Sequence, residues 1–312
     1  MKILITGIHG FVGSNIVKAM GRKHEIYGLD IVAPEKEGVV KTFSWNDFDE
    51  DKVVQVDAII HLAGKAHDLK KTSGPEVYFK VNTGLTQKVY DWFLKSSAKK
   101  FIFFSSVKAA ADFVPGDILT EDIVPNPVGP YGESKIKAEE YILSHPVADK
   151  QVYIMRPCMI HGPGNKGNLN LLYGVVKRGI PWPLGAFENH RCFTSIDNLC
   201  FAIEGLLAKD VASGIYNMCD DEALSTNDLI TVICKALGKK THIWYLPKGL
   251  MNLMSRIGDI LHLPLNSERL TKLTENYVVS NTKIKKALGV DKMPIRAEEG
   301  LTQTIKSFVN TK

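Results

Sequence analysis

Residues 2–13 read KILITGIHGFVG, an apolar run that passes into three glycines spaced three apart. The β-branched residues at its start predict a strand, and the residues after the glycines predict a helix. Glycine carries no side chain, so a turn built from it lets backbone N–H groups approach a diphosphate, whose charge the start of the helix favours. We therefore predict cofactor contacts from the residues of this turn, Gly7, Gly10, Phe11, Val12 and Gly13.

A carboxylate ends the next predicted strand, Glu25 to Asp30, seventeen residues beyond Gly13. In this position a carboxylate accepts hydrogen bonds from the adenosine ribose of a dinucleotide and repels a 2′-phosphate. Ile31 and Val32 follow, and no arginine stands beside them to neutralise such a phosphate. The pattern predicts NAD rather than NADP as the cofactor.

The first half of the chain alternates short apolar runs with amphipathic stretches, which is typical of βαβ units in a parallel sheet. The predicted strands are residues 2–6, 25–30, 41–44, 57–62, 100–105 and 152–156. Leu62, Ala63 and Gly64 end the fourth strand, where small residues border either a cofactor or a tightly packed neighbour. We predict an α/β fold, a Rossmann-type doubly wound parallel sheet, with these three residues at the cofactor.

The pattern changes after Pro157, where glycines and prolines mark a loop. Residues 194–208 read as a strand and a helix that return to the first domain, and a strand is predicted at 215–218. The C-terminal substrate domain is then smaller and discontinuous. The predicted cofactor-binding domain is 1–165 and 190–214, and the predicted substrate domain is 166–189 and 215–312.

Composition excludes several classes of protein. The chain has 312 residues, 45% of them hydrophobic, and a net charge of +5 from scattered lysines, which argues against a nucleic-acid partner. Its five cysteines show no metal-ligand spacing, so we predict reduced core thiols and no metal site. Without a signal-peptide pattern or a run long enough to span a bilayer, we expect a cytoplasmic protein with no membrane partner.

Residues 248–261 predict a helix with an apolar stripe made of Leu250, Met251, Leu253, Met254, Ile257, Ile260 and Leu261. Such a stripe occurs on helices that pack on a core and on helices that lie on a membrane surface. Because the polar positions are not rich in Lys or Arg, we favour the core.

Residues 130–135, PYGESK, place a phenol and an ammonium four residues apart, on one face of a helix. A nearby cation lowers the pKa of a phenol from about 10 and makes it a better base near neutral pH. Ser105 and Ser106 end a predicted strand, so a serine hydroxyl reaches the same edge of the sheet. An exposed polar pair and a turn cap are the alternatives. We predict a catalytic set of Ser106, Tyr131 and Lys135.

Taken in order, these motifs resemble those of the extended short-chain dehydrogenases/reductases of the NAD-dependent epimerase/dehydratase type. The resemblance covers nearly the whole chain. The shared motifs are TGxxGFxG at 6–13, Asp30, HLA at 61–63, Asn82, Ser105 with Ser106, YGxSK at 131–135 and Arg156 with Pro157. It implies a nucleotide-sugar substrate held by the second domain, and a homodimer.

The resemblance also implies roles for single residues. Tyr131 would be the general acid/base, Lys135 would hold the nicotinamide ribose and lower the pKa of Tyr131, and Ser106 would orient the reacting oxygen. Asn82, Ser105 and Pro157 would lie at the cofactor. The segment RCFTSIDNL at 191–199 resembles one whose arginine reaches the substrate diphosphate. The implied substrate contacts are Ser106, Asn168, Arg191 and Arg269, with an exposed arginine as the alternative for the last.

Several reactions fit this resemblance. We expect a UDP-sugar 4-epimerase. The alternative is a UDP-4-keto-sugar reductase of surface polysaccharide synthesis, because Val107-Lys108-Ala109 and Met159 depart from the UDP-galactose 4-epimerase pattern. The same Val107 and Lys108 replace the acidic pair of a 4,6-dehydratase. A dinucleotide-sensing protein without turnover is a third possibility, since fold does not prove activity.

Overall fold

The structure is a computed structural model that describes residues 1–32, 34–49, 51–66, 74–165, 167–263 and 265–310. Its strands are β1 (Lys2–Thr6), β2 (Glu25–Asp30), β3 (Lys41–Ser44), β4 (Ala58–His61), β5 (Lys100–Phe104), β6 (Gln151–Pro157), β7 (Met159–His161), β8 (Phe193–Ser195) and β9 (Gly214–Met218). Its helices are α1 (Phe11–Met20), α2 (Trp45–Asp49), α3 (Pro75–Tyr78), the π-helix η1 (Phe79–Gly84), α4 (Leu85–Lys95), α5 (Val107–Ala110), α6 (Pro130–Ser144), α7 (Asn168–Lys177), α8 (Ile196–Ala208), α9 (Thr226–Ala236), α10 (Lys248–Leu261), α11 (Ser267–Thr274), α12 (Thr282–Leu288) and α13 (Ala297–Asn310).

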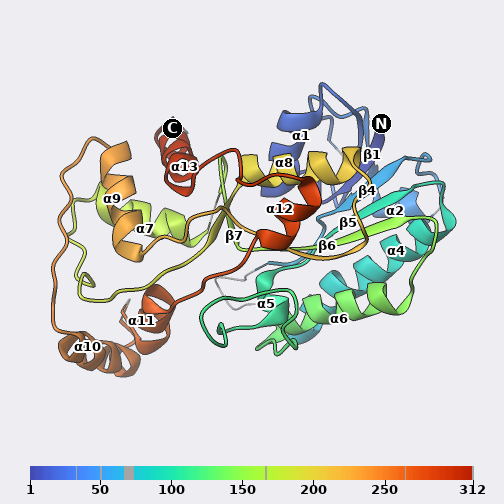
Figure 1. Ribbon diagram of the computed structural model, residues 1–312. Coiled ribbons are helices and arrows are strands. Elements are labelled where there is room, and N and C mark those ends of the chain that lie inside the picture. Colours follow the sequence, from blue (N-terminus) through green and yellow to red (C-terminus); the bar gives the residue numbers. More distant parts are fainter. Residues whose placement is uncertain (33, 50, 67–73, 166, 264, 311–312) are drawn as a thin grey trace.

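Seven parallel strands form the central sheet, in the order β3-β2-β1-β4-β5-β6-β9 (Figure 1). The chain runs outward from β1 to β3 on one side and from β4 to β9 on the other. The order therefore reverses between β1 and β4, and in such sheets the ligand crevice lies at the carboxyl ends of the strands beside this point. The predicted doubly wound sheet is confirmed.

Both faces of the sheet are covered by helices, so the side chains of its central strands are mostly apolar and buried. Alternate side chains of β1 enter different cores: Ile3 and Ile5 pack with α1, α8 and α12, and Leu4 packs with α2, α4 and α6. Figure 1 shows these helices on opposite sides of the sheet. The two cores hold the strand ends in fixed register, and this fixes the edge that carries the candidate site.

A smaller lobe holds α7, α9, α10, α11 and α13 (Figure 1), with its own core around Leu169, Ile230 and Ile305. The short parallel pair β7–β8 joins it to the sheet. Two elements depart from the predicted boundary at residue 214: β9 is the seventh strand of the sheet, and α12 packs on the sheet through Ile284 and Leu288. Residue 166, the other predicted boundary, lies outside the described residues. The two-domain division itself stays a prediction.

Six of the seven residues of the predicted apolar stripe of α10 are exposed, so the predicted core position holds only for Met251. Within the helix α10, only Met251, Ser255 and Gly258 are buried. A methyl group on Gly258 would overlap the carbonyl of Leu265, so small residues bring α10 against the loop that follows it. The hydrophobic periodicity predicted the helix, but the side of α10 that packs inward is set by Met251, Ser255 and Gly258.

The described residues include no helix with the length and apolar character needed to cross a bilayer. All five cysteines are buried free thiols, which confirms the predicted core thiols. Among the described residues we find no cluster of His, Cys, Asp and Glu suited to a metal ion.

Candidate active site

The glycine turn between β1 and α1 is tightly packed against its own backbone. Gly7 has φ of +70° and its N–H donates to the Leu29 carbonyl oxygen at 2.8 Å. A Cβ on Gly13 would lie 2.6 Å from the Gly7 oxygen and 2.8 Å from Ile8 Cα. A Cβ on Gly10 would meet only the Gly7 oxygen, at 3.1 Å. Gly7 and Gly13 are therefore required by the turn itself, whereas Gly10 is exposed and leaves its outer side open to a ligand.

Asp30 ends β2 beside this turn. One carboxylate oxygen accepts the His9 N–H at 2.9 Å, and the other accepts the Ile31 N–H at 2.7 Å. Each carboxylate oxygen has further acceptor capacity, and Ile31 and Val32 beyond it are 82% and 54% exposed. The carboxylate thus lies at an open edge, where ribose hydroxyls can donate to it.

Two other predicted cofactor residues lie at the same edge. Phe11 begins α1, and its ring lies 3.6 Å from the position of a Cβ on Gly162. Val12 packs against the sheet core beside it. Pro157 closes β6, where it pairs with Met218 of β9. They border the carboxyl edge from α1 and from the far strands.

The end of β4 is fixed by a buried histidine. The His61 ring hydrogen bonds Thr6 Oγ1 at 2.7 Å and Thr86 Oγ1 at 2.9 Å. Burial lowers the pKa of His61 to about 3, so the ring is neutral near neutral pH. Thr6 Oγ1 also accepts the Ala63 N–H at 3.0 Å, which sets the path of Leu62 and Ala63 across the crevice.

Asn82 connects the segment after β4 to α6. Its amide accepts the Lys65 N–H at 2.7 Å and donates to the Lys65 carbonyl at 3.1 Å and to Ser134 Oγ at 2.9 Å. Asn82 is buried in η1, a single stretch of wide helix of the kind often found at functional sites. A Cβ on Gly64 would lie 3.0 Å from Asn82 Oδ1 and 3.2 Å from Lys135 Nζ, so these three predicted residues converge.

The Tyr131 phenol and the Ser106 hydroxyl lie within reach of each other. Burial raises the pKa of Tyr131, and the hydrogen bond from Ser106 lowers that pKa. Ser106 Oγ caps α5 by accepting the Lys108 N–H at 3.2 Å, which leaves its proton for the phenol. A Cβ on Gly132 would lie 2.5 Å from the Lys108 carbonyl oxygen, so glycine lets the start of α6 approach α5. The sequence predicted both residues but not this close contact between their helices.

Lys135 lies one helical turn after Tyr131 and is buried. Its Nζ donates to the Phe104 carbonyl at the end of β5, at 2.7 Å. Burial lowers the pKa of Lys135 to about 8, and the charge of Glu139 acts in the opposite direction. A buried ammonium on the same helix face as the phenol is suited to stabilising a phenolate.

A buried ion pair that the sequence analysis missed lies behind this site. Arg156 Nε donates to the two Glu139 oxygens at 3.0 and 3.1 Å, and both side chains are at most 1% exposed. Ser105 Oγ also donates to Glu139, so its hydroxyl faces this pair, whereas we had predicted it at the cofactor. The spacing of Lys135 and Glu139, four residues apart on one helix face, was a usable signal for this neighbour.

The low pKa of Lys135 predicts a pH-dependent stability. Between about 8 and the ordinary value of 10.5, the unfolded chain keeps a proton that the folded chain releases, so the free energy of unfolding rises with pH. Lys135→Met should remove this rise, worth about 3 kcal/mol across the window. Urea unfolding at several pH values measures it, with the exposed Lys137→Met of the same helix as control. An equal slope in Lys135→Met and the wild type would contradict it.

The predicted substrate contacts lie in the smaller lobe and at its junction with the sheet. Arg191 is half-buried, hydrogen bonds the Lys272 carbonyl and pairs with Glu275 at 3.4 Å. Burial lowers the pKa of Arg191. Arg269 is exposed on α11, and Asn168 is exposed at the first position of α7. The structure places Arg191 near the end of α11.

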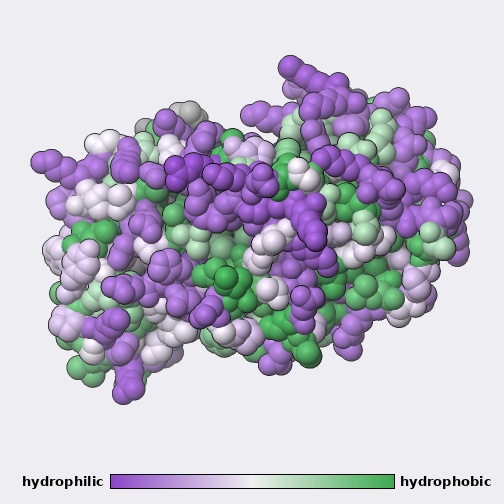
Figure 2. Space-filling view, viewed as in Figure 1, coloured by the Kyte–Doolittle hydropathy of each residue, from purple (hydrophilic) through white to green (hydrophobic). Residues whose placement is uncertain are grey.

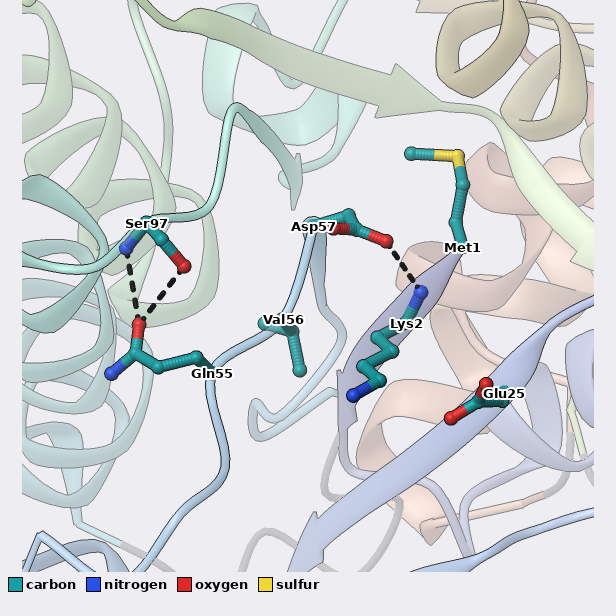
Figure 3. Close-up of a pocket in the computed structure, with 7 residues that line it drawn as sticks. All are labelled: Met1, Lys2, Glu25, Gln55, Val56, Asp57 and Ser97. Carbon is teal, nitrogen blue, oxygen red and sulfur yellow. Dashed lines mark hydrogen bonds between the residues drawn. The ribbon is translucent and has the colours of Figure 1, made fainter.

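An open pocket at the opposite edge of the sheet is shown in Figure 3. It lies at the amino ends of β1 and β2, where the Lys2 N–H donates to Asp57 at 2.7 Å and Ser97 donates to Gln55 at 3.1 Å. Its lining residues are Met1, Lys2, Glu25, Gln55, Val56, Asp57 and Ser97. Ligands of doubly wound sheets bind at the other edge, so we do not assign the site here.

Comparison with known proteins agrees with this geometry. The family model of the NAD dependent epimerase/dehydratase family matches residues 3–219. The UDP-glucose 4-epimerase of Vibrio cholerae is 30% identical over 98% of this chain and 95% of its own length. The N-acetyl-alpha-D-glucosaminyl-diphospho-ditrans,octacis-undecaprenol 4-epimerase of Escherichia coli O157:H7 is 27% identical over 99% of this chain and 96% of its own. The UDP-glucuronic acid 4-epimerase from Bacillus cereus, solved in complex with NAD, has the same fold, with a TM-score of 0.76 at 19% identity over 100% of both chains.

Proposed function

Because the chain belongs to the NAD dependent epimerase/dehydratase family, we propose that it interconverts the C4 epimers of a UDP-sugar. The observation that carries the proposal is the grouping of the Ser106 hydroxyl, the Tyr131 phenol and the buried Lys135 ammonium at the carboxyl edge of the sheet. A phenol, a hydroxyl donor and a cation supply what proton exchange at a sugar hydroxyl needs.

The residues of the carboxyl edge fit NAD. The open side of Gly10 suits a diphosphate at the start of α1, and the Asp30 carboxylate suits the adenosine ribose. Ala63, Gly64 and Asn82 would border the nicotinamide half. Bound NAD supplies a carrier that takes a hydride from the sugar and returns it.

Tyr131 performs the proton step of the proposed reaction. It takes the proton of the C4 hydroxyl as that carbon loses hydride, and it returns a proton when hydride arrives on the other face of the 4-keto sugar. Ser106 donates its hydrogen bond to the same sugar oxygen and holds it beside the phenol. Burial alone raises the pKa of Tyr131, so the Lys135 charge is needed to favour the phenolate.

The cofactor turn gives a binding prediction. Gly10→Ala should weaken NAD affinity by about tenfold or more, because a methyl group there occupies the open side facing the diphosphate. Isothermal titration calorimetry of the NAD-free protein measures the effect. Gly174→Ala in α7, whose added Cβ has open space around it, is the matched control and should leave the affinity unchanged. Equal NAD affinity of the wild type and Gly10→Ala would show that the glycine turn does not contact the cofactor.

A UDP-4-keto-sugar reductase is the second candidate, favoured by Val107, Lys108 and Met159 in the segments nearest the reacting sugar. Incubation with UDP-glucose, UDP-N-acetylglucosamine and their 4-keto derivatives separates the two. The epimerase proposal predicts a C4 epimer without net use of NADH. Stoichiometric oxidation of NADH would instead show that the protein is a 4-keto-sugar reductase. A sugar on undecaprenyl diphosphate, as named for the E. coli relative, belongs in the same panel because it too is attached through a diphosphate.

Other parts of the proposal concern substrate contacts and assembly. We assign Arg191, Arg269 and Asn168 to the substrate diphosphate and sugar, since all three lie in or beside the smaller lobe. The protein is proposed to be a cytoplasmic homodimer. Light scattering after gel filtration tests the dimer.

A further inference from the structure

Helix α10 turns an apolar stripe to solvent. Six side chains on this stripe are between 44% and 76% exposed, and we call them the α10 face: Leu250, Leu253, Met254, Ile257, Ile260 and Leu261. Figure 1 shows α10 at the outer end of the smaller lobe, and Figure 2 shows hydrophobic atoms there at the lower left. Exposed apolar patches of this kind mark interaction sites.

The α10 face cannot turn inward without losing the existing contact of the helix. Met251 reaches the core of the smaller lobe, and Ser255 and Gly258 lie along the same side. Gly258 already touches the backbone of Leu265 so closely that a methyl group would overlap it. The buried side of α10 is therefore narrow and closely packed, and the α10 face beside it is available to a partner.

Two large exposed aromatic residues shortly precede α10 in the chain. Trp244 is 55% exposed and Tyr245 is 71% exposed, in the segment that leads into α10. The backbone of Trp244 is fixed to Trp182 by a hydrogen bond of 2.8 Å, so the aromatic side chains leave an ordered segment. Exposed Trp and Tyr beside an apolar helix face are typical of proteins that bind at the level of lipid headgroups.

The charge around the α10 face is positive. Helices α10 and α11, which pack together, carry four Lys or Arg residues and two acidic residues, Asp259 and Glu268. The Asp259 carboxylate accepts two hydrogen bonds from Ser267, at 2.9 and 2.5 Å, so it is turned toward the loop after α10. The exposed basic side chains of these two helices are Lys248, Arg256, Arg269 and Lys272. This distribution complements anionic headgroups.

We propose that the α10 face docks on an anionic lipid bilayer surface. A second copy of the chain fits less well, because two such basic segments would face each other across a symmetric interface. α10 packs against α11, which carries Arg269, so docking would bring the proposed substrate side of the smaller lobe next to the bilayer. The inference does not depend on the reaction that the site performs.

Flotation of the full-length protein with vesicles tests the proposal. Wild type is expected to float with vesicles of phosphatidylglycerol and phosphatidylethanolamine and to stay behind with phosphatidylcholine alone. Leu253→Glu and Ile257→Glu should each lower the partition coefficient by about tenfold or more, because each puts a charge where the proposal inserts an apolar side chain into the bilayer surface. Val124→Glu, at an 83% exposed valine of the larger lobe, is the matched control and should float like wild type.

Basic residues give a second, independent readout. Removing one charge by Arg256→Gln should weaken binding to the anionic vesicles about fivefold, and added salt should weaken it further. The proposal is overturned if wild type ignores the anionic vesicles, or if Val124→Glu weakens flotation as much as Ile257→Glu. It is also overturned if Ile257→Glu changes the oligomeric state in buffer without vesicles, since a second copy would then cover the face. Because Leu253 and Ile257 are exposed, both variants should fold, and unchanged thermal unfolding verifies this.

Discussion

Replacing Tyr131 by Phe is expected to lower kcat by about 10²–10⁴-fold, the usual contribution of a general acid/base. The change removes the phenolic oxygen beside Ser106 and leaves the ring in place. With the packing kept, KM and the affinity for NAD should change little. Steady-state kinetics on the substrate identified in the product panel measure the effect.

A matched variant on the same helix separates the phenol from the fold. Tyr141 lies on α6, and its hydroxyl donates to Asp91 at 2.6 Å, away from the site. Tyr141→Phe removes a hydroxyl of the same kind and should keep kcat near the wild-type value. If Tyr131→Phe retains more than about a tenth of wild-type kcat, the proton step belongs to another group.

Arg156→Met should lower the free energy of unfolding by about 3–5 kcal/mol, because it leaves the Glu139 carboxylate buried without its cation. Glu139 keeps the hydrogen bond from Ser105, which is too weak to replace an ion pair. Urea or thermal unfolding at neutral pH measures the loss.

The double variant Arg156→Met with Glu139→Leu should regain most of that stability, since no buried charge then remains. Lys235→Met breaks the exposed pair with Glu298 and should cost less than about 1 kcal/mol. If Arg156→Met lowers the free energy of unfolding no more than Lys235→Met does, the Arg156–Glu139 pair does not stabilise the fold.

Strand positions followed from the sequence because local signals were strong. Residues 2–6, 25–30 and 41–44 form β1, β2 and β3 with the predicted bounds, and the glycine turn follows β1 as expected. Apolar runs bounded by Gly, Asp or polar residues determine both ends of such strands. The convergence of Ser106, Tyr131 and Lys135 also followed, because carboxyl ends of parallel strands share one edge.

Features that depend on tertiary packing could not be predicted from the sequence. The exposed side of α10 is set by contacts of Ser255 and Gly258 with the next loop, which periodicity cannot identify. The π-helix η1 around Asn82 was not predicted, because no local sequence pattern marks it. Ser105 follows the last residue of β5, and its hydroxyl donates to Glu139 of α6, a contact between distant residues that no local pattern indicates.

The fate of the hydrogen on C4 tests the central claim most directly. We would incubate the protein with NAD and a UDP-sugar that carries deuterium at C4, and follow the products by mass spectrometry. Return of the same hydride beside Tyr131 and Ser106 predicts that the C4 epimer keeps its deuterium. An epimer that has lost deuterium to water, or deuterium found in released NADH, would contradict the account.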